Sequence, residues 1–168
     1  HQRHPKIDRG NGGNHPPALQ PPQGGILLSG TGNDTGRIVL ASGSKIRSRI
    51  LENAGIGHVV DAASIDEKGL KEKLGKDRIG IELAAQALAQ AKAAAIAKIH
   101  PGVYVIGADQ ILELDGWWFN KPRDMEQAVA TLKTLRGHTH RLVSAVSVYH
   151  DKESLWKYVE TANLTMRD

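Results

Sequence analysis

A carboxylate that follows two very small residues at the end of an apolar strand is the first feature of this sequence that could do chemistry. Residues 103–112 are rich in β-forming side chains, and Asp109 comes directly after Gly107 and Ala108. An acid in such surroundings is costly to bury alone. We therefore expect Asp109 to have a cation, a metal ion or a proton as its partner.

The segment just before this strand supplies a candidate cation. Residues 80–99 are rich in alanine and precede a Pro-Gly pair at 101–102, which predicts a helix that ends there. At helical spacing Lys92 falls in the middle of the apolar face, where a lysine either extends to the rim or meets an anion. Because the strand with Asp109 follows immediately, we expect an ion pair between them. The predicted apolar face holds Ile81, Leu88, Ile96 and Ile99, and the predicted exposed face holds Glu82, Gln86, Gln90 and Lys98.

A short loop between a predicted strand and a predicted helix is a candidate anion site. Ser42 and Ser44 lie between an apolar strand at residues 38–41 and a helix at residues 45–54. Free backbone N–H groups, two hydroxyls and the positive end of a helix favour an anion there. Arg47 in the first helical turn opposes the helix dipole unless a phosphate binds nearby. A capping serine with a solvated arginine explains the same pattern, so both interpretations stay open.

Two adjacent carboxylates form a third candidate. Asp66 and Glu67 lie in a predicted loop of residues 64–67, after a predicted strand near residues 58–60, and a polar, lysine-rich stretch continues to Arg78. Paired carboxylates suit a divalent cation. An acidic pair in a loop is more often only solvated, so spacing alone does not decide between the two interpretations.

The remaining segments predict an α/β fold with a mixed, twisted sheet, flanking helices and a central cleft. Asp115-Gly116 predicts a hairpin turn between strands, and Asp124 predicts the start of a helix that ends near Gly137. Residues 141–150 and 155–166 alternate in polarity and predict an antiparallel hairpin. In the predicted helix after Asp124, the inward residues are Ala128, Val129, Leu132 and Leu135.

The composition of the chain limits which kinds of metal site, cross-link and domain organisation are possible. The 168 residues are 40% hydrophobic and 24% charged, with a net charge of +4 and no cysteine, so disulfides and thiolate metal sites are excluded. We expect no membrane span and a cytoplasmic location. Residues 1–36 hold five of the seven prolines and eight of the eighteen glycines, and we expect a disordered extension or tag there, followed by one domain at 37–168.

The order of these features is similar to that of the Maf (septum-formation inhibitor-like) family of nucleoside triphosphate pyrophosphatases. The likeness covers about residues 37–168. The segments that carry it are Leu40–Arg47, Ile65–Glu67, Ala91–Ala93, Ile106–Gln110, Lys121-Pro122 and Leu135–His140.

This resemblance implies hydrolysis of a nucleoside triphosphate to a monophosphate and pyrophosphate with Mg²⁺ or Mn²⁺. Asp109 would be the base that activates water, and Glu67 and Asp109 would hold the metal. The resemblance further implies catalytic cations at Arg47, Lys92 and Lys121, phosphate binding by Ser42 and Ser44, and substrate selection by Ile46 and Gln110.

The resemblance also has consequences for substrate and assembly. Gln110, in place of threonine after the aspartate, is similar to the branch that prefers 7-methyl-GTP. The family is commonly dimeric, which makes a homodimer an expectation, and nucleic acid is not expected as a partner. The chain departs from the usual motifs at Lys45, Ser48 and Asn120, and its last residue, Asp168, leaves an expected C-terminal lobe incomplete.

Two other classes of function fit the same residues. A non-catalytic module could bind nucleotide or nucleic acid in the basic cleft without turnover, and a cell-division regulator could use the fold as a scaffold. Release of pyrophosphate would separate an enzyme from both.

Overall fold

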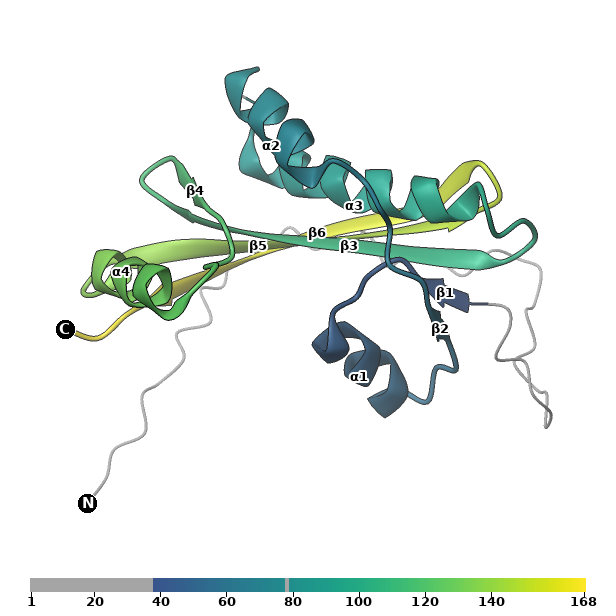
Figure 1. Ribbon diagram of the computed structural model, residues 1–168, viewed down its shortest axis with the longest axis horizontal. Coiled ribbons are helices and arrows are strands. Elements are labelled where there is room, and N and C mark those ends of the chain that lie inside the picture. The colour runs from purple at the N-terminus through teal and green to yellow at the C-terminus, as the bar shows by residue number, and fades with distance from the viewer. Residues whose placement is uncertain (1–37, 78) are drawn as a thin grey trace, which may run out of the picture. The chain divides into compact units, whose positions relative to one another are not determined.

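The central element of the fold is a long strand that pairs on both of its edges (Figure 1). The computed structural model describes residues 38–77 and 79–168, which all belong to one compact unit of the chain. The elements in chain order are β1 (Ile38–Leu40), α1 (Lys45–Asn53), β2 (Val59–Val60), α2 (Glu67–Lys76), α3 (Ile81–Ala97), β3 (Tyr104–Leu114), β4 (Trp117–Phe119), α4 (Met125–Leu135), β5 (Thr139–His150) and β6 (Glu153–Thr165).

The sheet is mixed, as the sequence predicts. Its strands follow the order β2-β1-β3-β5-β6, and β4 pairs with β3 beside this path. β1 is parallel to both β2 and β3, whereas the pairs β3–β4, β3–β5 and β5–β6 are antiparallel. The predicted hairpins are confirmed, and the turn between β3 and β4 uses positive φ angles at Asp115 and Gly116 (52° and 84°).

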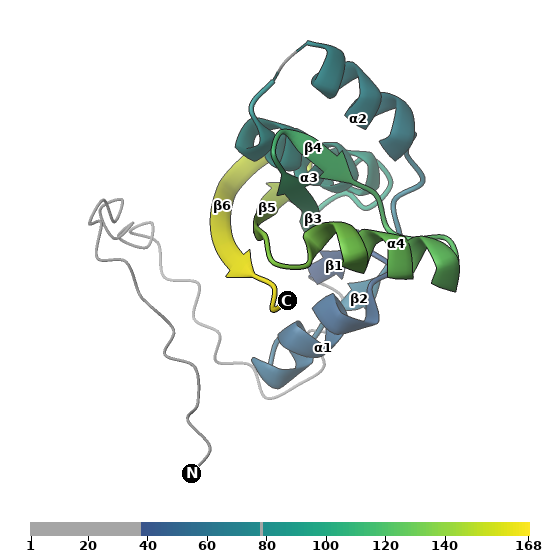
Figure 2. The same cartoon turned by 90° about the vertical axis from the view of Figure 1, so that its left-hand side faces the viewer.

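Helices flank this sheet, and α3 is the helix that packs on its strands. In Figure 1 α2 and α3 lie on one side of the long strands and α1 lies on the other, and Figure 2 shows α2 outside α3. The main core forms where α3 packs on β3 and β5, around the fully buried side chains of Leu88, Ile111 and Val143. Small residues make this packing close: a Cβ on Gly107 would lie 2.2 Å from the carbonyl oxygen of Ala89.

One edge of β3 is interrupted by a notch, which we define as the edge of residues 107–111. β1 pairs with β3 up to Ile106, and β4 pairs with β3 only from Leu112 onward. Among the described strands, none pairs with this edge over residues 107–111. The chain leaves the carboxyl ends of the parallel strands β1 and β2 on this side, which is where open α/β sheets bind ligands.

A helix that the sequence analysis did not predict begins at the second residue of the acidic pair. The stretch from Glu67 to Lys76, a polar, lysine-rich region for which we predicted no secondary structure, forms α2. The Asp66 carboxylate caps it by accepting a hydrogen bond from the Gly69 N–H at 2.9 Å. An acid in the first turn and lysines in the last turn complement the helix dipole. Capping and charge, together with the apolar pair Leu70 and Leu74 on one side, therefore specify this helix.

Several predicted core positions were wrong. Ile99 is 64% exposed because α3 ends at Ala97, whereas Gln86, expected on the exposed side, is buried. On α4, Val129 and Leu132 are exposed, and Leu135 is the buried residue. Helical periodicity predicted these elements but not how much of each face a neighbour covers.

Candidate functional site

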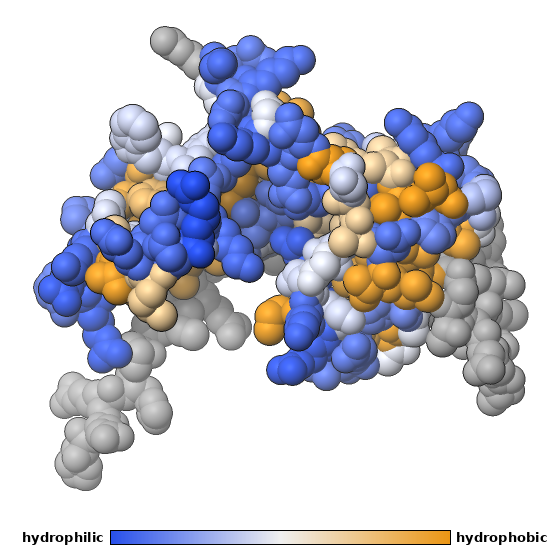
Figure 3. Space-filling view, viewed as in Figure 1, coloured by the Kyte–Doolittle hydropathy of each residue, from blue (hydrophilic) through white to orange (hydrophobic). Residues whose placement is uncertain are grey.

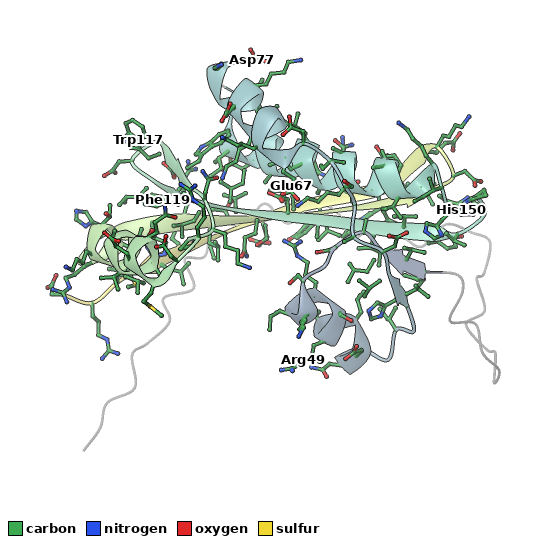
Figure 4. All side chains as sticks on the ribbon, viewed as in Figure 1. Arg49, Glu67, Asp77, Trp117, Phe119 and His150 are labelled. Atoms are coloured by element: carbon green, nitrogen blue, oxygen red, sulfur yellow. The ribbon has the colours of Figure 1, made fainter. Side chains whose placement is uncertain are left out.

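Lys92 is the centre of the candidate site. Its Nζ lies 2.7 Å from Asp109 Oδ1 and 2.9 Å from Glu67 Oε2. Lys92 and Asp109 are 7% and 8% exposed, whereas the Glu67 side chain is half exposed. The three residues come from α3, β3 and the first turn of α2, and Glu67 lies over the middle of β3 (Figure 4). The predicted ion pair between Lys92 and Asp109 is confirmed.

The alternation of β3 explains why Asp109 faces Lys92. Val105, Gly107 and Ile111 are buried on the side of α3, and Asp109 lies between them at the same two-residue period. Our expectation that Asp109 ends its strand was wrong, because β3 continues to Leu114. The notch beside residues 107–111 nevertheless leaves this part of the strand open at its edge.

The charges explain how two acids are accommodated in one place. Asp109 is buried, and the ammonium of Lys92 supplies the partner that a buried carboxylate requires. Glu67 adds a second carboxylate to the same ammonium. The contact therefore joins two carboxylates to one ammonium.

The serine loop joins the site through Arg47. Its Nη1 donates to Ser42 Oγ and to the carbonyl oxygen of Ala108, each at 2.9 Å. Ala108 is the neighbour of Asp109 in β3, so the loop and the acids meet at the notch. The Ser44 N–H lies 3.4 Å from Ser42 Oγ, and the Ser44 side chain does not cap its own helix. Its hydroxyl and the first N–H groups of α1 are thus suited to an anion.

Three predicted site residues are not brought into these contacts. Ile46 is 64% exposed on α1. Gln110 is exposed and donates from Nε2 to Ser144 Oγ at 2.8 Å. Because side chains alternate along a strand, it projects on the side of β3 opposite to Asp109. Lys121 is exposed in the segment after β4. The contacts described above connect Ser42, Ser44, Arg47, Glu67, Lys92 and Asp109.

Lys71 is a residue of this region that sequence reasoning missed. Its Nζ donates to the carbonyl oxygen of Phe119 at 3.0 Å and to Asn120 Oδ1 at 2.9 Å. Burial lowers the pKa of Lys71 below its ordinary value, while the nearby charges of Asp109 and Glu67 act in the opposite direction. The sequence feature that could have identified Lys71 is its position four residues after Glu67. This spacing places the two side chains on the same side only if the segment is a helix.

The acidic pair is divided by the fold. Asp66 caps α2, so only Glu67 reaches the site, and the described residues hold no group of three or more His, Cys, Asp or Glu side chains that could bind a metal. Glu67 and Asp109 still place two carboxylates around one point. Mg²⁺ is commonly held by one or two carboxylates together with substrate phosphates, so this donor set fits such an ion.

The surface is indented between α1 and α4, and the side chains around the indentation are mainly hydrophilic (Figure 3). Hydroxyls, cations and a helix N-terminus at the ends of parallel strands define a class of α/β proteins that bind phosphate groups. Among the described helices, none is long and apolar enough to cross a membrane.

The chain belongs to the Maf family, because residues 37–168 match the family described as Maf-like protein. It is 45% identical over 130 residues to the nucleoside triphosphate pyrophosphatase of Paramagnetospirillum magneticum, covering 77% of this chain and 67% of that protein. It is 44% identical over 134 residues to the 7-methyl-GTP pyrophosphatase of Brucella abortus, covering 80% and 67%. The resemblance predicted from the motifs is confirmed.

The chain spans about two thirds of the length of these curated relatives. Among solved structures, it is similar to the nucleoside-triphosphatase / dITP/XTP pyrophosphatase of Mycobacterium abscessus. The identity is 17%, the likeness covers 76% of this chain and 71% of that one, and the TM-score is 0.43, which makes it a distant likeness.

Proposed function

We propose that this chain is a nucleoside triphosphate pyrophosphatase, which cleaves a nucleoside triphosphate between the α and β phosphates. The observation that carries the proposal is the contact of the buried Lys92 with both Asp109 and Glu67, next to the Arg47–Ser42 loop. Membership of the Maf family and the printed names of its curated relatives support the same reaction.

Asp109 is the proposed general base. Water is a poor nucleophile, and a positioned carboxylate orients it and accepts its proton. Lys92 holds Asp109 in place through the ion pair at 2.7 Å. Lys92 also brings Glu67 to the same point, so that one side chain organises both acids.

The cations and hydroxyls are the proposed phosphate-binding groups. Arg47, Lys92 and Lys121 would neutralise the charge that grows on the phosphoryl oxygens as the anhydride bond breaks. Ser42, Ser44 and the first N–H groups of α1 would bind a phosphate at the notch. This role resolves the unfavourable place of Arg47 in the first turn of its helix.

Glu67 and Asp109 would hold a divalent cation, Mg²⁺ or Mn²⁺. When bound, such an ion neutralises phosphate oxygens and lowers the pKa of a coordinated water. Lys92 and Arg47 supply the fixed positive charge of the site, so the residues of the chain bind and orient the triphosphate from two sides.

Gln110 and Ile46 are the proposed selectors of substrate, with 7-methyl-GTP as one candidate. Both side chains are exposed, so a bound nucleotide can reach them. The names of the curated relatives include both nucleoside triphosphate pyrophosphatase and 7-methyl-GTP pyrophosphatase, which supports testing both kinds of substrate. The homodimer and the cytoplasmic location stay predictions.

A turnover screen tests this function. Standard and methylated nucleoside triphosphates are incubated with the protein and Mg²⁺ or Mn²⁺, and pyrophosphate and orthophosphate are measured separately. We expect pyrophosphate and the monophosphate in equal amounts. Nucleotide binding without pyrophosphate, or an affinity that rises with nucleic-acid length, would support a binding module instead.

A further inference from the structure

The helix α2 packs against the rest of the structure along only one of its sides. None of the residues of this helix is fully buried, although Leu70 and Leu74 pack against the main core. Its first residue, Glu67, bonds Lys92, and one turn later Lys71 reaches the end of β4. Residues four apart lie on the same side of a helix, so both polar contacts lie on the side that faces the site.

The contacts of Lys71 join segments that are far apart in the chain. One ammonium bonds a backbone oxygen of Phe119 and a side-chain oxygen of Asn120, 48 and 49 residues away. Phe119 and Asn120 are the two residues that come before Lys121 in the chain. A lysine has three N–H donors, so the two bonds fix the position of this short segment relative to α2.

We infer that Lys71 is a positioning residue, which clamps the segment Phe119-Asn120-Lys121 to α2 and thereby sets the place of Lys121 relative to Glu67 and Asp109. The catalytic consequence rests on the proposed function, whereas the clamp itself does not. Lys71 would act through Lys121 and Glu67, and it is not itself one of the groups proposed to touch the substrate.

The chemistry of the clamp explains why a lysine is suited to this place. The ammonium is half-buried and lies near the negative charges of Asp109 and Glu67, which attract it toward the site. An apolar side chain of similar length would leave the carbonyl oxygen of Phe119 and the amide of Asn120 without this donor. An arginine would keep the charge and could donate to both acceptors.

The clamp is tested first without any substrate. Backbone hydrogen exchange of residues 117–123 is compared in the wild type, Lys71→Met, Lys71→Arg and Lys73→Met. Lys73 is an exposed lysine of the same helix that points about 200° away from Lys71, so it is a matched control. We expect faster exchange in Lys71→Met alone, with folding of each variant checked by its thermal midpoint.

The catalytic consequence is tested by kinetics of pyrophosphate release. We expect Lys71→Met to lower kcat/KM roughly tenfold to a hundredfold, as for the loss of hydrogen bonds from a charged donor. Lys71→Arg should restore most of the loss, and Lys73→Met should change little. Added to Lys121→Ala, Lys71→Met should have a much smaller effect, because the two residues act as one unit.

The outcomes separate the two proposals. Unchanged exchange of residues 117–123 in Lys71→Met, or effects of Lys71→Met and Lys121→Ala that simply multiply, would overturn the role of Lys71. A wild-type protein that releases no pyrophosphate from any triphosphate would overturn the proposed function, while the exchange measurement would still decide whether the clamp exists.

Discussion

At the scale of single residues, the decisive interaction is the one between Lys92 and two carboxylates. A lysine in the middle of a helix face that packs on a sheet is costly unless an anion meets it. Asp109 is buried beside it and Glu67 approaches from the solvent side. The opposite charges thus offset one another's cost of burial, and the three ionisable groups lie together at one point of the notch.

Replacing Lys92 tests this dependence. Lys92→Met should lower the free energy of unfolding by about 3 kcal/mol, because Asp109 is left buried without its cation. The measurement is urea unfolding at neutral pH. Lys98→Met, at the exposed end of the same helix, is the control and should change the value by less than about 0.5 kcal/mol. Equal effects of the two substitutions would show that the buried pair contributes nothing.

Sequence reasoning predicted most of this cluster but not all of it. Asp109 and Lys92 were predictable because a charge within an apolar pattern stands out. Lys71 was not, since it lies among other lysines in a polar stretch, and its contacts with Phe119 and Asn120 depend on tertiary structure. Asp66 was predicted as a possible metal ligand, but its carboxylate accepts a hydrogen bond from the free N–H of Gly69, three residues later, and caps α2 instead.

At the scale of elements, the distance between α3 and β3 is set by small residues. A Cβ at Gly107 would lie 2.2 Å from the Ala89 carbonyl oxygen and 2.7 Å from the Ala93 backbone nitrogen. Ala93 is next to Lys92, and Gly107 is two residues before Asp109. The close packing of the two elements therefore also fixes the site.

Gly107→Ala should separate the helix from the strand. We expect a loss of about 1–3 kcal/mol in the free energy of unfolding, because the obstructing atoms belong to the backbone. Pyrophosphate release should fall with it. In contrast, a Cβ at Gly75 in α2 would meet no atom within 4 Å, so Gly75→Ala should be neutral or stabilise slightly. A tolerated Gly107→Ala would contradict this account of the packing.

A second ion cluster joins the far end of β3 to β5 and α3. Glu113 lies directly opposite Arg141 in the sheet, and Arg141 also reaches Glu82. Burial acts to raise the pKa of Glu113, but hydrogen bonds from Arg141 and the Gly116 N–H, with the charge of Arg141, outweigh it and lower this pKa below its ordinary 4.5.

This lowered pKa gives a pH dependence with a definite sign. The unfolded chain binds the proton more readily than the folded chain, so the contribution of Glu113 is present above pH 4.5 and is lost as the pH falls through the folded pKa. Urea unfolding between pH 3 and pH 6 should show this loss in the wild type and in the exposed control Glu153→Gln. In Glu113→Gln the slope should be smaller; an unchanged slope would contradict the assignment.

The elements divide by the kind of signal that specifies them. β3, α3 and the β5–β6 hairpin were predicted because apolar periodicity dominates their sequences. α2 was missed because its apolar signal is short, Leu70 and Leu74 alone, and caps and charges supply the rest. The notch beside residues 107–111 could not be predicted, since it arises from where β1 and β4 stop along the edge of β3.

At the scale of the molecule, the site lies where a small parallel part of the sheet meets a long antiparallel part. The parallel part contributes the serine loop and the segment that ends at Glu67, and the antiparallel part contributes Asp109. α3 connects both parts through Lys92. The whole arrangement brings acids and cations from distant segments to the same edge, which is what a metal-assisted reaction of a polyphosphate requires.

The most direct test compares pyrophosphate release by the wild type and by Asp109→Asn in saturating Mg²⁺ or Mn²⁺. The control is Asp115→Asn, in the β3–β4 turn, where asparagine tolerates the positive φ. Our account predicts that Asp109→Asn lowers kcat by about 10²–10⁴ while the fold is kept, and that Asp115→Asn matches the wild type. Pyrophosphate release by Asp109→Asn within a few-fold of the wild type would contradict the account.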